Sequence, residues 1–489
     1  MSLSFEQYPV DDSQKLPVIT NWTPLIGYML YRNASIAALF YYKLVLEVYT
    51  GTAVVTANLI GKIKQRRNGY SVDVTSDYAR AFFDLRELAN TQLVDTVFDQ
   101  NQTGIPFQTI HKIGVNVAAE PFSFNGDSRI AKTQIIALTV RGLENYSDAA
   151  NTSPSDDTSD AITDTLYYMQ ASLPLLTARN TTSTYIQSTA FQPYQASAST
   201  DLFLSDLETA PGDYGLRGYI NYVQDTDYHT VAFLNDATNF TSDLDYIQIA
   251  YYDSSGSLLN DAEYIANIAA NGGIAPDDGS LANDGRLLYF GCGPGNLEAQ
   301  SDNTDARPSN NSGWAYYTIR GTSTTNTNPA AATPETDLYY FIKQDGSCKG
   351  FKVRRLAWRN SLGCYDYFNF KMKSSQTITV ERNNFNTLIG RYNASKWYYN
   401  NTMRGKTTRQ TTAVVKETLN TDWISQDQAV LLEKLIVSTN VYIIENADTT
   451  YTEGVIITDS SFIKKTTAND GLIQYTINIE YANSINTNS

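Results

Sequence analysis

The sequence predicts a mainly β protein made of several β-sandwich-like modules, with one short helix in the N-terminal module and one in the C-terminal module. The first observation behind this fold class is the number of tyrosines, 35 of 489 residues, because Tyr, Thr, Val and Ile favour pleated, half-buried strands. The second is that segments of period-two alternation recur between loops rich in Asn, Asp, Gly and Ser. The third is length, since a chain of 489 residues is too long for one core, and we expect two to four domains.

The N-terminal module is expected to cover residues 1–146, as β strands with an extended N-terminal arm and one helix. FYYKLVLEVYTG (40–51) alternates with period two, which is typical of a half-buried strand. A second strand is expected at 57–67, and the Asn68-Gly69 dipeptide after it favours a tight turn. DYARAFFDLRELANTQL (77–93) has helical spacing, so the helix of this module is placed there.

The central module is expected at residues 147–336 and the C-terminal module at 337–489. The central module begins with SDAANTSPSDDTSDAITD (147–164), which has little that can pack and is predicted to be a surface loop or a mobile insert. Short strand candidates follow it, and we expect a β-rich insertion or projecting domain. In the C-terminal module SQDQAVLLEKLIVS (425–438) is predicted to be a helix, because a capping box begins at Ser425 and apolar residues follow with helical spacing.

Charge and cysteine content restrict the classes of partner. The net charge of −15 argues against a nucleic-acid groove or an anionic membrane as partner, and we interpret local basic runs such as MRGKTTR (403–409) as solvated loop ends. No stretch approaches the roughly 20 apolar residues that span a bilayer, and the N-terminus lacks the pattern of a signal peptide. The spacing of the three cysteines fits neither a disulfide framework nor a zinc site, although one 348–364 bridge is an alternative. They are Cys292, Cys348 and Cys364.

Residues that carry catalysis are scarce. The two histidines, His111 and His229, lie in different segments, and no nucleophile motif accompanies them. GCGPGNLEAQ (291–300) is glycine-rich but lacks the ending of a phosphate-binding loop, so a tight turn is the better interpretation. Two pairs of aspartates are compatible with incidental cation binding or, less well, with a glycosidase pair. They are Asp225/Asp227 and Asp243/Asp245. We therefore expect no enzyme, no cofactor and no dedicated metal site.

The stretch LAWRNSLGCYDYFNF (356–370) is the densest run of aromatics and turn-formers in the chain. Asn360-Ser361-Leu362-Gly363 is predicted to form a turn between two strands, with Gly363 free to adopt positive φ. Large rings surround this turn, and Asp366 is expected to accept hydrogen bonds from turn amides or to pair with a nearby arginine. The rings are Trp358, Tyr365, Tyr367 and Phe370, and the arginines are Arg354, Arg355 and Arg359. A hairpin corner that fixes register is preferred, with a sugar or peptide site as the alternative.

Two patterns in the C-terminal module resemble a family of virion proteins. The first is W-x-N-x-x-G-x-Y-D-x-F-x-F, and the second is a Trp and a Ser followed by leucines and a Val-Tyr pair. They comprise Trp358, Asn360, Gly363, Tyr365, Asp366, Phe368 and Phe370, and then Trp423, Ser425, Leu431, Leu435, Ser438, Val441 and Tyr442. These patterns are similar to those of structural proteins of tailed bacteriophages, especially marine phages and phages of Bacteroidetes hosts, including crAss-like phages. The resemblance covers roughly 1–146 and 337–489, although Trp423 lies closer to its helix than the pattern has it.

The resemblance implies a non-enzymatic subunit of a tail, neck or baseplate, assembled in the cytoplasm of a bacterial host and located in the virion. Such a subunit would assemble with copies of itself into a symmetric ring and would dock neighbouring rings or fibres, with no direct nucleic-acid binding and no membrane insertion. The central module would then project outward or dock another component. A receptor- or carbohydrate-binding virion protein is the alternative, and a depolymerising enzyme is a third hypothesis.

Overall fold

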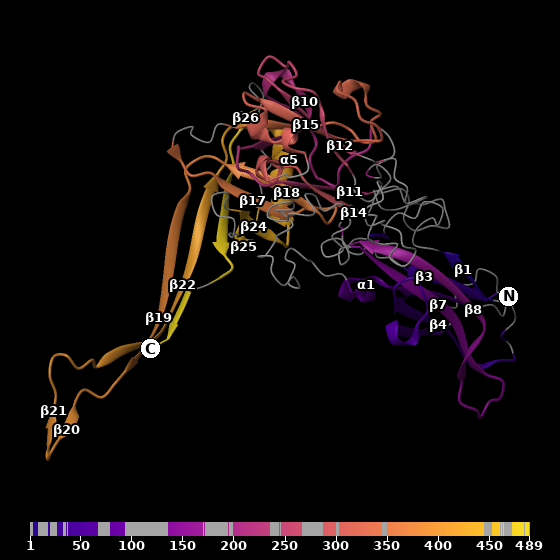
Figure 1. Ribbon diagram of the computed structural model, residues 1–489. Coiled ribbons are helices and arrows are strands. Elements are labelled where there is room, and N and C mark those ends of the chain that lie inside the picture. The colour runs from indigo at the N-terminus through magenta and orange to yellow at the C-terminus, as the bar shows by residue number, and fades with distance from the viewer. Residues whose placement is uncertain are drawn as a thin grey trace. The chain divides into compact units, whose positions relative to one another are not determined.

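The computed structural model describes residues 3–7, 18–19, 27–32, 36, 38–66, 79–92, 135–169, 171, 194, 199–234, 244, 246–266, 287–299, 303–344, 350–444, 452–459, 461, 463, 472–483 and 485–488. The protein is mainly β, with several antiparallel sheets (Figure 1), which confirms the predicted fold class. The chain divides into two compact units. Unit 1 comprises Met1–Lys343 and Asn360–Asp366, and unit 2 comprises Gln344–Arg359 and Tyr367–Ser489. The division into three modules stays a prediction.

The N-terminal part of unit 1 holds two sheets that share one hydrophobic core. The five-stranded sheet has the order β2-β8-β7-β4-β5, with β2 Val18–Ile19, β8 Ser155–Met169, β7 Ile135–Ser147, β4 Phe40–Thr50 and β5 Leu59–Gln65. The three-stranded sheet has the order β1-β3-β6, with β1 Leu3–Gln7, β3 Gly27–Arg32 and β6 Ala79–Asp84, and helix α1 Arg86–Gln92 follows it. Residues of both sheets meet in the core, among them Leu30, Phe83, Leu46 and Val140.

Two local predictions in this region are wrong. The segment 77–93 is not one helix, because β6 occupies its first half and only α1 is helical. Ala79, Ala81 and Phe83 are buried at alternate positions, so burial in β6 follows the two-residue period of a strand and not the period of a helix. The segment 147–164 is not one loop, because β8 begins at Ser155 and pairs with β7. The expected boundary at 146/147 therefore falls within the β7–β8 hairpin.

The remainder of unit 1 is built on a six-stranded sheet with the order β13-β12-β15-β16-β10-β9. Its strands are β13 Glu263–Ala266, β12 Tyr246–Tyr252, β15 Tyr316–Thr322, β16 Tyr339–Lys343, β10 Arg217–Val223 and β9 Thr209–Pro211. A separate pair is formed by β11 Thr230–Leu234 and β14 Leu287–Gly291. The short helical segments are η1 Thr56–Asn58, η4 Asp213–Gly215, η5 Thr304–Ala306, η6 Pro308–Asn310, η7 Pro329–Ala331 and α4 Pro294–Glu298.

The glycine-rich segment 291–300 contains the short helix α4 instead of a tight turn. A Cβ on Gly293 would lie 2.4 Å from the backbone nitrogen of His229 and 2.5 Å from the carbonyl oxygen of Asp227. Asn296 Oδ1 accepts a hydrogen bond from that same nitrogen at 2.9 Å. The glycine is therefore explained by close backbone packing, and His229 is a buried residue whose ring meets Phe341 edge-on.

Unit 2 contains an eight-stranded sheet with the order β18-β17-β24-β25-β27-β22-β19, in which β22 also pairs with β28. Its strands are β18 Tyr365–Phe370, β17 Arg354–Arg359, β24 Val441–Ile444, β25 Thr452–Ile457, β27 Thr476–Tyr481, β22 Lys406–Asn420, β19 Ser375–Asn386 and β28 Ile485–Asn488. Two small ladders join β23 Ile424–Ser425 to β26 Leu472–Ile473 and β20 Arg391–Asn393 to β21 Lys396–Tyr398. Helix α5 spans Gln426–Val437, and its capping box between Ser425 and Gln428 is present as predicted.

Candidate assembly surface

A long two-stranded hairpin, residues 375–420, extends from the main sheet of unit 2 (Figure 1). Its strands β19 and β22 pair antiparallel from Ser375 opposite Thr418 to Asn386 opposite Lys406. All 12 residues of β19 are exposed, so the strand has no buried face. Such a strand is held by its ladder and by cross-strand side-chain pairs alone. We call residues 375–420 the long hairpin and residues 382–409 the hairpin tip.

One edge of β19 is open among the residues that the structure describes. The strand stands last in the order of its sheet and pairs only with β22. Its outward backbone N–H and C=O groups are therefore available to another strand. Natural proteins usually shorten, cover or charge such an edge, whereas β19 is long and exposes Ile378, Val380 and Phe385.

The hairpin tip has a defined internal structure. Strands β20 and β21 pair from Arg391 opposite Tyr398 to Asn393 opposite Lys396. The Trp397 ring lies against Gly390, where a Cβ would approach ring atoms to 2.4 Å, and Gly390 has φ +114°. Tyr392 meets Trp397 edge-on, with ring centroids 5.3 Å apart. Both the ring packing and the backbone angle therefore require glycine at 390.

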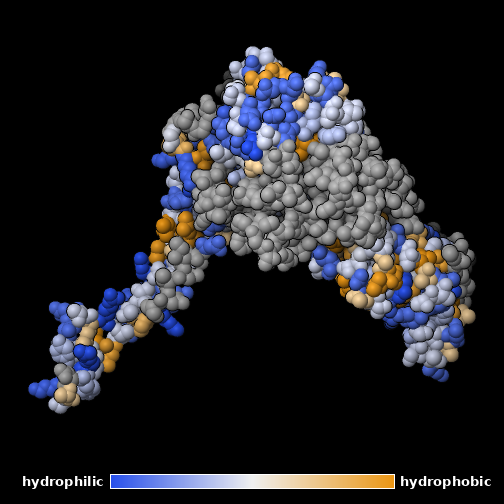
Figure 2. Space-filling model, viewed as in Figure 1, coloured by the Kyte–Doolittle hydropathy of each residue, from blue (hydrophilic) through white to orange (hydrophobic). Residues whose placement is uncertain are grey.

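The surface of the tip is apolar and aromatic as well as polar. Leu388 is 81% exposed, Tyr392 75% and Tyr399 69%, and the rings of Trp397 and Tyr398 are also exposed. Figure 2 shows apolar and hydrophilic residues interleaved along the hairpin. Exposed rings and aliphatic side chains are enriched in interaction surfaces, so the tip is a candidate for one.

The tip is also basic in an acidic protein. Between Arg382 and Arg409 the sequence has six Lys or Arg residues and no Asp or Glu. Removing these six positive charges from the net charge of −15 leaves −21 for the rest of the chain. MRGKTTR (403–409), interpreted from the sequence as solvated loop ends, is one part of this longer basic run. The signal that was available is the length of the run without an acidic residue.

The predicted corner in residues 356–370 is a turn held by side-chain hydrogen bonds. Gly363 has φ +84°. Asn360 Oδ1 accepts from the backbone nitrogens of Leu362 at 3.1 Å and Cys364 at 2.9 Å, and Asn360 Nδ2 donates to the carbonyl oxygen of Leu204 at 2.9 Å. The turn residues 360–366 belong to unit 1, and the Asn360 amide ties them to the segment around residue 204.

Asp366 is a buried carboxylate in the same network. Its Oδ1 accepts from the Ser205 hydroxyl at 2.6 Å, and its Oδ2 accepts from the backbone nitrogen of Asp206 at 2.9 Å. The Asp206 carboxylate in turn accepts from the backbone nitrogen and the hydroxyl of Ser361. Burial, followed by the nearby Asp206 charge, raises the pKa of Asp366 to about 7. Of the arginines weighed as partners, Arg354 pairs with Glu417 at 2.8 Å.

The other motif residues serve packing and capping. Trp358 is completely buried, and no hydrogen-bond partner of its Nε1 is found in the described part of the chain. Tyr365 and Phe370 are buried, Phe368 meets Phe370 with ring centroids 5.1 Å apart, and the Arg355 guanidinium lies over the Tyr367 ring. Ser425 caps α5. Trp423 is 59% exposed, so the structure does not place it with the others.

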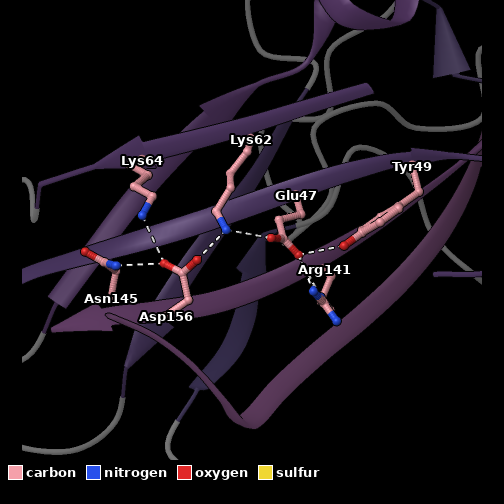
Figure 3. A network of polar contacts seen from close by, with 7 residues as sticks. All are labelled: Glu47, Tyr49, Lys62, Lys64, Arg141, Asn145 and Asp156. Atoms are coloured by element: carbon pink, nitrogen blue, oxygen red, sulfur yellow. Dashed lines mark hydrogen bonds and ion pairs between the residues drawn. The ribbon is translucent and has the colours of Figure 1, made fainter. Parts of the chain in front are cut away.

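A second polar network crosses the five-stranded sheet of unit 1 (Figure 3). Glu47 is buried and accepts from the Tyr49 hydroxyl at 2.7 Å, from Lys62 Nζ at 2.8 Å and from Arg141 Nε at 2.8 Å. Burial raises the pKa of Glu47, but these donors outweigh it and lower the pKa below its ordinary value. Lys62 also bonds Asp156. Since every strong charge here has a partner, the network fixes the pairing of β4, β5, β7 and β8.

Clusters suited to a metal ion and helices suited to crossing a membrane are not found in the described ranges. No cluster of three or more His, Cys, Asp or Glu side chains that suits a metal ion occurs there, and no described helix is long and apolar enough to cross a membrane. Cys292 and Cys364 are buried, and the Tyr289 hydroxyl lies 3.6 Å from Cys364 Sγ, whereas Cys348, His111, Asp243 and Asp245 lie outside the described residues. No protein-family model matches the chain, and no curated protein matches it significantly.

Proposed function

We propose that this protein is a non-enzymatic structural subunit of a bacteriophage tail, neck or baseplate, which assembles with copies of itself into a symmetric ring and contacts neighbouring rings or fibres. The observation that carries the proposal is the long hairpin. Its strand β19 is exposed on both faces and has an open edge, and its tip exposes a cluster of aromatic rings. Residues of this kind become stable when they are buried in a protein interface. The motif around Trp358 supports the bacteriophage assignment.

The hairpin is long enough to supply a substantial contact. Stable interfaces bury on the order of 1,200–2,000 Å² in total. The exposed residues of β19 and of the tip follow one another in sequence and could contribute together to such an interface. Strand addition along β19 would satisfy its outer N–H and C=O groups, and the rings of the tip would give apolar burial. The acidic remainder of the chain makes an anionic polymer a poor partner.

The test is the mass of the assembled protein. We expect the purified full chain to form a closed oligomer, measured by light scattering after size exclusion and by negative-stain electron microscopy. A trimmed variant, in which residues 384–409 are replaced by Asn-Gly, joins Asn383 to Gln410, which are opposite each other in the ladder. It keeps the part of β22 that pairs with β28.

The trimmed variant should remain folded and become monomeric, because it loses the tip and the end of β19. Circular dichroism and cooperative urea unfolding serve as the control for folding. If the native chain stays monomeric at every concentration measured, the assembly proposal is wrong. Cryo-electron microscopy of the native virion, with this subunit located in the tail, neck or baseplate, tests the bacteriophage assignment separately.

Carbohydrate binding is a second candidate, because one observation favours it. Tyr392, Trp397, Tyr398 and Tyr399 expose rings at the hairpin tip, and sugar faces stack on such rings. A glycan array with the native chain and the trimmed variant would test this function. Binding that disappears on trimming, in a native chain that is monomeric, would favour recognition over assembly.

A further inference from the structure

The six-stranded sheet of unit 1 has one face lined by tyrosines, which we call the tyrosine face. Tyr252 lies opposite Tyr316 in the β12–β15 ladder, and Tyr316 lies opposite Ile342 in the β15–β16 ladder. The face comprises Tyr214, Tyr222, Tyr252, Tyr316 and Tyr340. Because neighbours in a strand point to opposite sides, the alternate residues Tyr317 and Phe341 belong to the other face, and both are fully buried.

The tyrosine face is built from stacked rings and remains partly open. Tyr252 and Tyr316 stack with centroids 4.9 Å apart, and Tyr214 stacks on Tyr316 at 5.9 Å. Tyr340 lies beside Tyr316 at 6.3 Å and covers Gly218, where a Cβ would meet its ring at 2.9 Å. Tyr214 is 48% exposed, and Tyr222, Tyr252 and Tyr340 are half-buried. Aromatic rings are therefore presented to solvent on a rigid sheet.

Carboxylates border this face. Asp213 precedes Tyr214, Asp253 follows Tyr252, and Asp337 lies near Tyr340. Burial first, and then nearby groups that include Asp253, raise the pKa of Tyr316. The whole segment 199–344, which contains the sheet, has twenty Asp or Glu residues and five Lys or Arg residues. Its charge is opposite to that of the hairpin tip, which has basic residues only.

We propose that the hairpin tip of one copy of this chain binds the tyrosine face of a second copy. Tyr392, Trp397 and Tyr399 would pack against the exposed rings, since aromatic pairs contribute beyond their buried area. Arg391, Lys396 and Arg404 would lie over the rings and beside the bordering carboxylates. This inference rests on the proposed assembly and assigns its two surfaces.

A second copy is the occupant that the charges favour. Anionic lipid or nucleic acid would also attract the basic tip. Both would be repelled by the rest of the chain, whose net charge without the tip is −21. Another copy presents both an acidic border and a row of rings. The same sequence thus contains two complementary surfaces, and each copy offers both.

The first experiment reverses charges in the full chain. Arg391→Glu, Lys396→Glu and Arg404→Glu together should weaken self-association at least ~10-fold in sedimentation velocity. The control reverses three basic residues of unit 2 outside the hairpin, Lys352, Lys373 and Lys434, which changes the net charge equally. The control should associate as the native chain does. Association of the native chain should also weaken as salt rises.

The second part restores the complementarity. Asp213→Lys with Asp253→Lys should weaken association alone, and should restore it when combined with the reversed tip in the same chain, because the two surfaces are then complementary again. Variants that simply misfold could not be rescued in this way. Failure of the combined chain to associate better than either parent would overturn the proposal.

A cross-link identifies the partner directly. Chains with Tyr392→Cys and chains with Tyr214→Cys, which carry different tags, are mixed and oxidised, and a disulfide-linked pair bearing both tags supports the contact between copies. Absence of this pair from the assembled oligomer overturns the assignment of the two surfaces, while the assembly itself stands. Binding of phosphatidylserine vesicles or single-stranded DNA through the tip, in place of self-association, would also overturn the assignment of the two surfaces. A native chain that stays monomeric would overturn both this assignment and the proposed function.

Discussion

Replacing Asp366 by Asn should remove a pH dependence from the stability of unit 1. The protonated acid and the amide both offer one acceptor and one donor. In either form the oxygen can accept from the backbone nitrogen of Asp206 while the other atom donates to the Ser205 hydroxyl oxygen, in the positions that Asp366 occupies now. The ionised carboxylate, by contrast, must stay charged in a buried site near Asp206. Asn therefore imitates the form of Asp366 that the fold prefers.

The magnitude follows from the pKa of Asp366, which is raised from 3.8 to about 7. Because the folded pKa lies above the unfolded one, the native state keeps a proton that the unfolded state has released between about pH 4 and pH 7. The free energy of unfolding therefore falls as the pH rises through this window and is level above it. At about 1.4 kcal/mol per pH unit, the change from pH 5 to pH 8 amounts to roughly 2–3 kcal/mol.

Urea unfolding at pH 5, 6, 7 and 8 would measure this change. The native chain should lose stability across the series, and Asp366→Asn should lose roughly 2–3 kcal/mol less over the same range. Asp213→Asn is the matched control, because Asp213 is exposed, and its profile should follow that of the native chain. If Asp366→Asn and the native chain show parallel profiles, Asp366 is ionised in the fold and the reasoning fails.

Three further substitutions test the packing. Trp358→Ala should destabilise unit 2 by about 3–5 kcal/mol in urea unfolding, because it empties a fully buried site. The control, Trp423→Ala at an exposed site, should change the free energy of unfolding by less than about 0.5 kcal/mol. Equal effects of the two substitutions would contradict the assigned burial. Glu47→Gln should cost about 2–4 kcal/mol, since it leaves partly buried cations without their carboxylate, and thermal unfolding that is unchanged would show that the network contributes nothing. Gly390→Ala should displace the Trp397 ring and strain the backbone, whose φ is +114°, so that one fluorotryptophan resonance moves in ¹⁹F NMR; an unmoved spectrum would refute the ring contact.

Local signals in the sequence were sufficient where the structure is locally determined. Helix α5 forms where Ser425 and Gln428 predicted its start, because a capping box acts within one turn. Gly363 adopts positive φ in the expected turn. The segment 77–93 was misassigned because Ala, Phe and Leu suit both periods, and the neighbouring strand β3 supplies the ladder that decides for β6. Segment 155–164 became a strand because β7 pairs with it and polar partners such as Asn145 bond its carboxylates.

The candidate surface was harder to predict from the sequence, because it depends on which elements do not pack against β19. All residues of β19 are exposed because no described element packs on either of its faces, and no residue pattern in the sequence records this. The partners of Asp366 lie about 160 positions earlier in the chain, at Ser205 and Asp206, so spacing could not reveal them. Only the basic composition of the tip was visible in the sequence.

The two surfaces of the proposed contact differ, and this difference determines the kind of assembly. A tip that binds a tyrosine face joins two different surfaces, so the contact is either reciprocal between two copies or heterologous, with each copy using one surface toward one neighbour and the other surface toward the next. Such contacts close into a ring when the rotation between copies divides a full turn, and otherwise continue as a filament. The charges oppose the alternatives, because two basic tips repel each other and two acidic borders repel each other. The charge distribution of this chain therefore favours contacts of tip with tyrosine face over contacts of tip with tip or of face with face, and the proposed ring is the closed form of such contacts when they are heterologous.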